Sequence, residues 1–256
     1  MKVTLLGTGT SQGVPVIACE CNVCLSSDTK DKRLRSSVIV EIGNQNIVID
    51  TGPDFRQQML REKITDVDAI LFTHHHTDHV IGMDDIRAFN YKWKKDMDVY
   101  CSRDTGIALK NVFPYIFEDN SYPGVPRVNI NTIKNRSFKI NDLKITPIKA
   151  MHYKMPIYGF RIKKFIYLTD VSEITKKEKE KMMNADLIIL DSLQRKKHIS
   201  HFNLEQSLEL LNELKPKQAL LTHISHYMGL HELVNRELPN NIQLAYDGQS
   251  IELSEN

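Results

Sequence analysis

Four histidines lie within six positions of the segment LFTHHHTDHVIG, residues 71–82. They are His74, His75, His76 and His79, with the carboxylate of Asp78 among them. Imidazoles crowded in this way repel one another once protonated, so a metal ion is the first candidate to hold them together. His74 and His76 are two residues apart and face the same way in an extended chain. A turn can direct Asp78 and His79 to a neighbouring position, so the pattern offers ligands for two adjacent metals.

Other apolar stretches also end at a histidine or an aspartate, among them YLTD, LIILDS and LLTH. Side chains at strand ends converge at one edge of a sheet, where a rigid scaffold directs them to a shared point. His152 after LKITPIKAM, Asp170 in FIYLTD and His223 in QALLTH are therefore candidate ligands. Each alone is more often an ordinary polar residue at a strand end. Together with the first cluster, they complete a dinuclear site.

The remaining pattern predicts an α/β fold. Short β-rich runs recur from VTLLG to IQLAYDG, with helical patterns between several of them. Residues 203–214 predict a helix with Leu204, Leu208 and Leu211 on one face and Asn203 as its N-cap. The chain has 256 residues and neither a low-complexity linker nor an obvious repeat. We therefore expect a single domain over residues 1–256, with sheet inside and helices outside.

Three of the four cysteines, Cys19, Cys21 and Cys24, lie in the segment CECNVC. Four cysteines are too few for a disulfide scaffold, which favours metal binding. The triplet is one ligand short of a tetrahedral structural zinc site, and His226 in LLTHISHYM is a candidate for the fourth ligand. A redox pair or an iron–sulfur ligand set is the alternative, although three cysteines leave either incomplete.

Composition and charge narrow the expected partners. The formal net charge of +2 does not point to nucleic acid. No apolar run approaches the roughly 20 residues that cross a bilayer, and the N-terminus lacks a signal-peptide pattern, so we expect no membrane contact and a cytoplasmic location. The charge run KKEKEKMM at 176–183 predicts a solvated helix with i,i+4 ion pairs. We assign no role to His198 and His231, and expect His75 to support the site without binding metal.

At this point the chain resembles the metallo-β-lactamase-fold hydrolases, because THHHTDH matches their signature and the later His, Asp and His follow in order. The resemblance implies a four-layer αβ/βα sandwich with two facing mixed β-sheets. It assigns His74, His76 and His152 to one metal, Asp78, His79 and His223 to the other, and Asp170 to a bridge between them. Zn²⁺ or Mn²⁺ would fill both positions. The iron-binding, oxygen-reducing branch usually has Glu in place of His76, which argues against a redox role.

A narrower resemblance rests on the segments GTGTSQGVPVIACECNVC, RLRSS, LTD and LLTHISH. These segments are similar to the PhnP-type phosphoribosyl 1,2-cyclic phosphate phosphodiesterases over nearly the whole chain. The resemblance implies a structural Zn²⁺ held by Cys19, Cys21, Cys24 and His226. It also singles out His201, just before the expected helix start, where backbone N–H groups favour anions. His201 could bind phosphate or protonate the leaving oxygen, and the alternative is a solvent-facing loop histidine. Relatives are often dimers, so a homodimer is a further expectation.

The resulting prediction is a metal-dependent hydrolase, specifically a phosphodiesterase acting on a small cyclic or linear phosphodiester. Hydroxide held by two metals roughly 3.5–4 Å apart attacks phosphorus, with Asp78 and His201 as the catalytic residues. Two dications against Asp78 and Asp170 leave a charge of about +2, or +1 with a bridging hydroxide, which suits an anionic substrate. Nucleic acid is a less attractive partner, because the net charge of the chain is only +2 and no long Gly/Pro-rich arm is visible. The alternatives are a thioester, a lactone or an RNA 3′ end on the same site. Outside enzymes, the alternative is a metal or redox sensor that turns over no ester.

Overall fold

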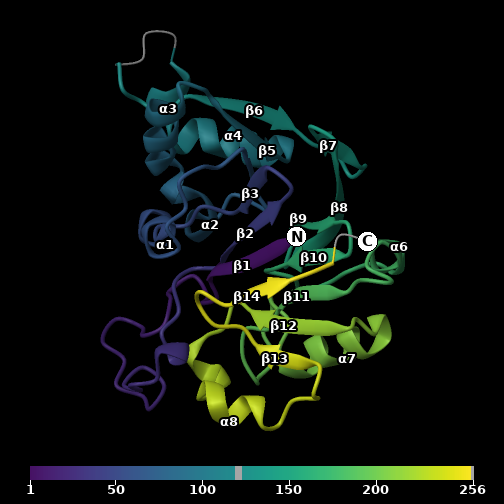
Figure 1. Ribbon diagram of the computed structural model, residues 1–256. Helices are drawn as coiled ribbons and strands as arrows, with labels where there is room; N and C mark the ends of the chain where they lie inside the picture. The colour runs from purple at the N-terminus through teal and green to yellow at the C-terminus, as the bar shows by residue number, and fades with distance from the viewer. Residues whose placement is uncertain (119–122, 255–256) are drawn as a thin grey trace. The chain divides into compact units, whose positions relative to one another are not determined.

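The computed structural model describes residues 1–118 and 123–254 (Figure 1). The chain divides into two units, each built on one seven-stranded mixed sheet. Unit 1 comprises Met1–Leu6, Ser37–Lys134 and Ser250–Asn256, and unit 2 comprises Gly7–Ser36 and Asn135–Gln249. The expected α/β class with two mixed sheets is confirmed. The expected single domain over residues 1–256 stays a prediction.

The sheet of unit 1 has the strand order β14-β1-β2-β3-β4-β5-β6. Its strands are β1 (Lys2–Gly7), β2 (Ser37–Ile42), β3 (Gln45–Ile49), β4 (Ala69–Leu71), β5 (Met97–Cys101), β6 (Val128–Thr132) and β14 (Ser250–Glu252). Strands β3 to β6 run parallel, with helical segments between them along the chain. Parallel strands are usually buried on both faces, and every residue of β4 is buried. The carboxyl ends of these strands meet at one edge of the sheet.

The helices of unit 1 pack against this sheet through apolar side chains. They are α1 (Phe55–Arg61), α2 (Thr77–Val80), η2 (Ile81–Ile86), α3 (Arg87–Trp93), α4 (Arg103–Val112) and α5 (Pro114–Phe117). Phe55 of α1, Phe89 of α3 and Leu109 of α4 belong to one buried cluster. The same cluster contains Ile70 of β4 and Val99 of β5, so the helices and the strands share a single core.

The sheet of unit 2 has the strand order β13-β12-β11-β10-β9-β8-β7 (Figure 1). Its strands are β7 (Phe138–Ile140), β8 (Leu143–His152), β9 (Met155–Ile162), β10 (Phe165–Leu168), β11 (Leu187–Asp191), β12 (Gln218–Thr222) and β13 (Ile242–Leu244). Strands β10 to β13 run parallel. Strand β8 runs in their direction, because β8–β9 and β9–β10 are both antiparallel pairs. The carboxyl ends of β8, β10, β11 and β12 therefore lie at the same edge.

The helices of unit 2 include the one that the sequence predicts most clearly. They are η1 (Thr29–Asp31), α6 (Lys176–Glu180), α7 (Leu204–Leu214), η3 (His226–Met228) and α8 (His231–Asn235). The side chain of Asn203 accepts a hydrogen bond from the Gln206 backbone N–H, and the Gln206 side chain accepts one from the Asn203 backbone N–H. This reciprocal cap fixes the start of α7 and confirms the predicted N-cap. Leu211 is buried in the cluster that contains Leu190 of β11.

One expectation about an element was wrong. The segment 176–183 is not a fully solvated helix, because Glu178 is 5% exposed. Its carboxylate accepts hydrogen bonds from the backbone N–H of Lys149, the side-chain amide of Asn135 and the ammonium of Lys181. The ion pair spans three positions and not the expected four. The hydrogen bond from the Lys149 backbone to Glu178 thus ties α6 to strand β8.

None of the helices in the described ranges 1–118 and 123–254 combines the length and the apolarity that a membrane span requires.

Candidate metal centres

The histidine-rich segment of unit 1 starts at the carboxyl end of β4. After Leu71, the chain passes through two further buried residues to His74. Strand β3 ends beside it and continues into Asp50, whose φ of 64° is in the left-handed region. The carboxylate of Asp50 accepts hydrogen bonds from the backbone N–H of Thr73 at 2.9 Å and from its hydroxyl at 2.8 Å. A buried aspartate in a strained backbone conformation thus anchors the start of the segment.

Two histidines of this segment have their tautomers fixed by Asp50 and Thr73. The Nδ1 atom of His79 lies 2.8 Å from Asp50 Oδ2, and a carboxylate accepts, so Nδ1 carries the proton. The Thr73 hydroxyl donates to Asp50 and therefore accepts from Nδ1–H of His74, 2.9 Å away. Both imidazoles consequently have their lone pair on Nε2. A carboxylate or hydroxyl behind the ring is the usual support of a metal-binding histidine.

The ligand candidates of unit 1 lie within contact distance of one another. The ring centroid of His74 lies 4.7 Å from that of His76 and 4.2 Å from that of His79. The Nε2 atom of His79 lies 3.2 Å from Asp78 Oδ2. His74 and His79 are buried, whereas His76 is exposed. The side chain of His75 approaches His76 less closely, at 6.0 Å between ring centroids.

Gly82 allows the chain to return after the histidines. Its backbone N–H donates to the Thr51 carbonyl at 2.9 Å, and the Thr51 N–H donates to the His79 carbonyl at 2.7 Å. A Cβ atom at position 82 would overlap the carbonyl oxygen of Gly52. Only glycine permits this close approach, which holds α2 against the residues that follow Asp50.

Unit 2 gathers the remaining candidates at the carboxyl ends of its strands. His152 is the last residue of β8, Asp170 follows β10 by two positions, and His223 directly follows β12. Asp170 and His223 both have φ of 58°, in the left-handed region. The Nε2 atom of His223 lies 3.3 Å from Asp170 Oδ1. All three residues are at least nine-tenths buried. The convergence predicted for these strand ends is therefore present within unit 2.

His152 is oriented by the backbone of a neighbouring loop. Its Nδ1 atom lies 2.8 Å from the carbonyl oxygen of Ser200. A carbonyl accepts, so Nδ1 carries the proton and Nε2 has the lone pair that a metal would take. Burial lowers the pKa of His152, partly opposed by the charge of Asp170. The neutral imidazole that metal binding needs is thereby favoured.

His201 lies among the ligand candidates of unit 2. Ligand atoms of His152, Asp170 and His201 all lie within 4.8 Å of one another. The Nδ1 atom of His201 is 3.2 Å from Asp191 Oδ2 and 3.8 Å from Asp170 Oδ1. Its ring stacks on that of His223, with centroids 4.8 Å apart. At 8% exposure it is not the solvent-facing loop histidine of the alternative interpretation.

Asp191 supports His201 from the end of β11. Its carboxylate is fully buried and also accepts a hydrogen bond from the backbone N–H of Val171 at 3.0 Å. Burial raises the pKa of Asp191 well above its usual range, and the charge of Asp170 acts in the same direction while His223 opposes it. In unit 1, burial likewise raises the pKa of Asp50, and the charge and hydrogen bond of His79 oppose it.

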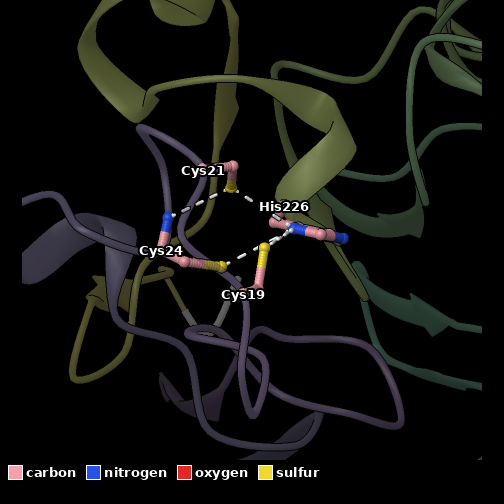
Figure 2. A group of neighbouring side chains, drawn as sticks. All are labelled: Cys19, Cys21, Cys24 and His226. Carbon is pink, nitrogen blue, oxygen red and sulfur yellow. Dashed lines mark hydrogen bonds between the residues drawn. The ribbon is translucent and has the colours of Figure 1, made fainter.

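The three cysteines and His226 form a separate cluster within unit 2. Figure 2 shows the Sγ atoms of Cys19, Cys21 and Cys24 directed at Nδ1 of His226. The three distances are 3.2, 3.4 and 3.6 Å. A hydrogen bond from the Cys24 backbone N–H is the main cause that lowers the pKa of Cys21 to about 6. Cys21 is then a thiolate at neutral pH, which is the form that binds metal.

This cluster has the dimensions of a tetrahedral zinc site. Sulfur and nitrogen ligands at about 2.3 and 2.0–2.1 Å from one tetrahedral centre lie about 3.6 Å apart. The Sγ to Nδ1 distances approach that value, and all four ligand atoms lie within 4.8 Å of one another. The fourth cysteine, Cys101, is buried in the core of unit 1. The redox pair and the iron–sulfur set fit this arrangement less well, because an imidazole completes it.

The donor sets of both units fit divalent metals. Each combines imidazole nitrogens with carboxylate oxygens, which suit zinc and manganese. The supporting residues Asp50, Thr73, Asp191 and Ser200 were not assigned from the sequence. Asp50 and Asp191 did carry a signal, since each ends an apolar strand in the same way as the ligand candidates. The sharing of the ligands between two metals stays a prediction from the resemblance.

Comparison with known proteins identifies the family. A family model described as the beta-lactamase superfamily domain matches residues 45–224. The chain therefore belongs to the β-lactamase superfamily, and the expected metallo-β-lactamase fold is confirmed. The fold, the PhnP-family neighbour and the donor sets together place the chain in an enzyme family of hydrolases that bind divalent metal.

Individual relatives refine this class. A solved structure of a diphosphatase from the PhnP family is 39% identical, with a TM-score of 0.93 over 99% of this chain and 98% of that one. The resemblance to the PhnP type is thereby confirmed. The structure of Zn²⁺-bound PqqB from Methylobacterium extorquens is 20% identical, with a TM-score of 0.80 over 99% of this chain and 100% of that one. At this identity, the similarity shows the fold alone.

A relative with a different name is similar in sequence. A protein of Porphyromonas gingivalis named Octanoyltransferase is 38% identical over 251 residues, which cover 97% of this chain and 51% of that protein. The chain thus spans about half the length of this relative. The name applies to a protein twice as long and does not by itself describe the aligned half.

Proposed function

We propose that the chain is a metal-dependent phosphodiesterase that cleaves a small cyclic or linear phosphodiester. The observation that carries the proposal is the position of His201, buried beside Asp170 and His152 with its Nδ1 atom 3.2 Å from the Asp191 carboxylate. Phosphodiester hydrolysis needs a proton donor next to the metal ligands, because the leaving oxygen must be neutralised. The 39% identity to a PhnP-family diphosphatase supports a phosphate-containing substrate in general.

The roles of the residues follow from their hydrogen bonds. Asp191 accepts from Nδ1–H of His201. In the imidazolium form, which the Asp191 carboxylate stabilises, Nε2 of His201 also carries a proton, and this proton passes to the leaving oxygen. Asp50 and the Ser200 carbonyl hold His79 and His152 in the tautomer that binds metal. Asp78 and Asp170 balance part of the metal charge. Divalent metals at these ligands would supply Lewis acidity and a hydroxide nucleophile near neutral pH.

The proposal extends to the cofactors and partners. The histidine and carboxylate ligands would hold Zn²⁺ or Mn²⁺, and Cys19, Cys21, Cys24 and His226 would hold a structural Zn²⁺. The substrate is a small anion, the chain binds neither membrane nor nucleic acid, and it forms a homodimer.

Hydrolysis of an acyl thioester is the second candidate. The observation that favours it is the Porphyromonas gingivalis relative, whose name refers to transfer of an octanoyl group. Acyl transfer uses an activated ester, and a metal-activated hydroxide can also attack such a carbonyl. The general-acid position of His201 favours the phosphodiester, since a thiolate is a good leaving group and needs a proton donor less than an alkoxide does.

Metal removal and substitution test the phosphodiesterase. Chelator-stripped protein should not hydrolyse bis(p-nitrophenyl) phosphate or a 2′,3′-cyclic nucleotide, and Zn²⁺ or Mn²⁺ should restore the activity. His76→Ala should abolish the restored activity. His201→Ala should reduce it on the cyclic nucleotide, whose leaving group is an alkoxide, more than on bis(p-nitrophenyl) phosphate, whose p-nitrophenolate needs a proton less. His75→Ala is the matched control and should retain it, because His75 is an adjacent histidine outside the ligand set. Inactivity of the metal-loaded wild-type protein on both substrates would refute the phosphodiesterase.

A further inference from the structure

A cavity lies between α1 and α3 in unit 1. Its volume is about 300 Å³, which is at the lower end of the range of small-molecule sites. Phe55, Met59 and Phe89 line it and also belong to the buried core of unit 1. Ile64, which packs against that core, lines it as well. The cavity is therefore a hollow in the side of the core, with a mainly apolar wall.

The cavity leaves apolar surface in contact with water. Leu60 lines it and is 61% exposed, although the preceding residue, Met59, is buried. Ala88 of α3 also lines the cavity and is exposed. Water against such a wall finds few hydrogen-bond partners, so an apolar group that displaces it gains free energy. The wall therefore favours a ligand with an apolar body.

Two cations line the same cavity. Arg56 of α1 and Lys92 of α3 are both exposed. Across residues 1–118 and 123–254, neither side chain takes part in an ion pair. The Lys92 ammonium has one long hydrogen bond, to the Thr65 carbonyl at 3.4 Å. One carboxylate, that of Asp85, lines the cavity as well, so two positive charges against one negative charge leave +1.

We propose that this cavity binds a small amphiphile with an apolar body and a single negatively charged head group, namely a medium-chain carboxylate. The apolar body lies against Met59, Leu60 and Phe89, and the head group lies at Arg56 and Lys92. A guanidinium can bind a carboxylate through two parallel N–H···O bonds. The local charge of +1 matches one carboxylate, whereas a phosphomonoester carries close to two negative charges. The site is separate from the candidate metal ligands and is independent of the proposed hydrolysis.

Trp93 provides the signal for a binding measurement. It is the only tryptophan of the chain, and its indole N–H donates to the carbonyl of Thr65, which lines the cavity, at 3.1 Å. The Lys92 ammonium lies 4.9 Å from the centre of the indole ring. A head group that draws Lys92 towards the cavity should therefore change the emission of Trp93. Pentanoate, heptanoate and 1-heptanol would be titrated into the protein, with calorimetry in parallel.

The length of the ligand tests the apolar wall. Heptanoate should bind about 15-fold more tightly than pentanoate, because each of its two additional methylene groups contributes about fourfold when buried. The neutral 1-heptanol should bind more weakly than heptanoate, because it lacks the charged head group. Equal affinities of pentanoate and heptanoate, or no heat and no change in emission, would overturn the proposal.

Substitutions test the position of the ligand. Arg56→Ala should weaken heptanoate binding about tenfold and leave 1-heptanol binding unchanged. Ala88→Leu fills the cavity and should weaken the binding of both compounds. Arg103→Ala removes an exposed arginine of α4 in the same unit and should bind both like the wild type. Circular dichroism checks the fold of each variant. Unchanged affinity for heptanoate in both Arg56→Ala and Ala88→Leu would locate its binding elsewhere and overturn the proposal.

A second copy of the chain is the other candidate occupant of this surface. Leu60→Glu places a charge on the apolar wall, and sedimentation of wild type and variant would be compared. Dissociation of a dimer in Leu60→Glu, with no binding of heptanoate to either form, would assign the surface to an interface between copies and overturn the ligand site.

Discussion

At the scale of single residues, the site is organised by the groups behind the histidines. His79 donates to Asp50, His152 to the Ser200 carbonyl, and His201 to Asp191. In neutral His79 and His152 the proton on Nδ1 leaves the lone pair on Nε2, whereas His201 acts as an acid in the imidazolium form, with protons on both nitrogens. The spacing of the histidines identified the ligand candidates from the sequence alone. The supporting groups required the structure, because Asp50 and Asp191 end strands in the same way as Asp170.

Replacement of Asp191 tests the orientation of His201. Asp191→Asn preserves the shape of the side chain and can still accept from the Val171 N–H. It removes the carboxylate that holds the His201 tautomer, so kcat for a cyclic phosphodiester should fall about 10–100-fold. Circular dichroism should show an unchanged fold. A variant with wild-type kcat would show that Asp191 does not position His201.

His231 makes stability dependent on pH. Burial, together with the positive charges of Arg33 and Lys30, lowers the pKa of His231 to about 4. The Nη2 atom of Arg33 lies 3.2 Å from His231 Nδ1, which requires an unprotonated nitrogen there. The unfolded chain binds a proton below its pKa of about 6.5, whereas the folded chain does so only below about 4. This residue therefore stabilises the fold by up to about 3 kcal/mol at neutral pH, and that contribution is lost between pH 6.5 and 4.

Urea unfolding at about pH 7.5 and pH 4.5 measures this effect. His231→Asn removes the titrating group, so the loss of unfolding free energy on acidification should be smaller in the variant. The comparison cancels the titration of the other histidines, which both proteins share. Equal losses in the two proteins would contradict the assigned pKa.

At the scale of elements, a strand could be predicted from the sequence where its run of apolar residues was long. The strands that end at His or Asp contain long apolar runs, and each was found. Strand β6 alternates with asparagines, and β9 contains Pro156 and Gly159, so neither resembled a strand in the sequence. A Cβ at Gly159 would lie 2.7 Å from the carbonyl oxygen of Tyr167, so the approach of β10 requires glycine there. Such contacts with a neighbouring strand are not visible in a local pattern.

The loop that carries the cysteines also depends on a distant partner. Val23 and Cys24 form only a small buried cluster with Val14, and Leu230 packs against it. So few apolar contacts give little stability, which a bound zinc would supply.

Cys19→Ser should release one equivalent of zinc and expose the loop to limited proteolysis. Metal analysis by plasma mass spectrometry checks this against Cys101→Ser, which should keep its zinc. Unchanged zinc content in Cys19→Ser would exclude Cys19 as a ligand.

At the scale of the whole molecule, the fold and the family could be predicted from the sequence. The THHHTDH motif occurs there together with several apolar strands that end at a His or an Asp. The substrate could not be predicted, because the metallo-β-lactamase fold carries many hydrolytic activities and the ligands alone do not distinguish them. The longer relative named Octanoyltransferase and the PhnP-family diphosphatase point to different classes of substrate. Our proposal of the phosphodiester rests on the position of His201 beside Asp170 and His152.

The most direct test compares the two substrate classes on one preparation. The kcat/KM of the metal-loaded protein would be measured for a 2′,3′-cyclic nucleotide and for an octanoyl thioester, each with wild type and with His201→Ala. We predict a larger kcat/KM for the cyclic nucleotide, and a loss in His201→Ala that is confined to this substrate. Faster hydrolysis of the thioester, with no effect of His201→Ala on the phosphodiester, would contradict the account.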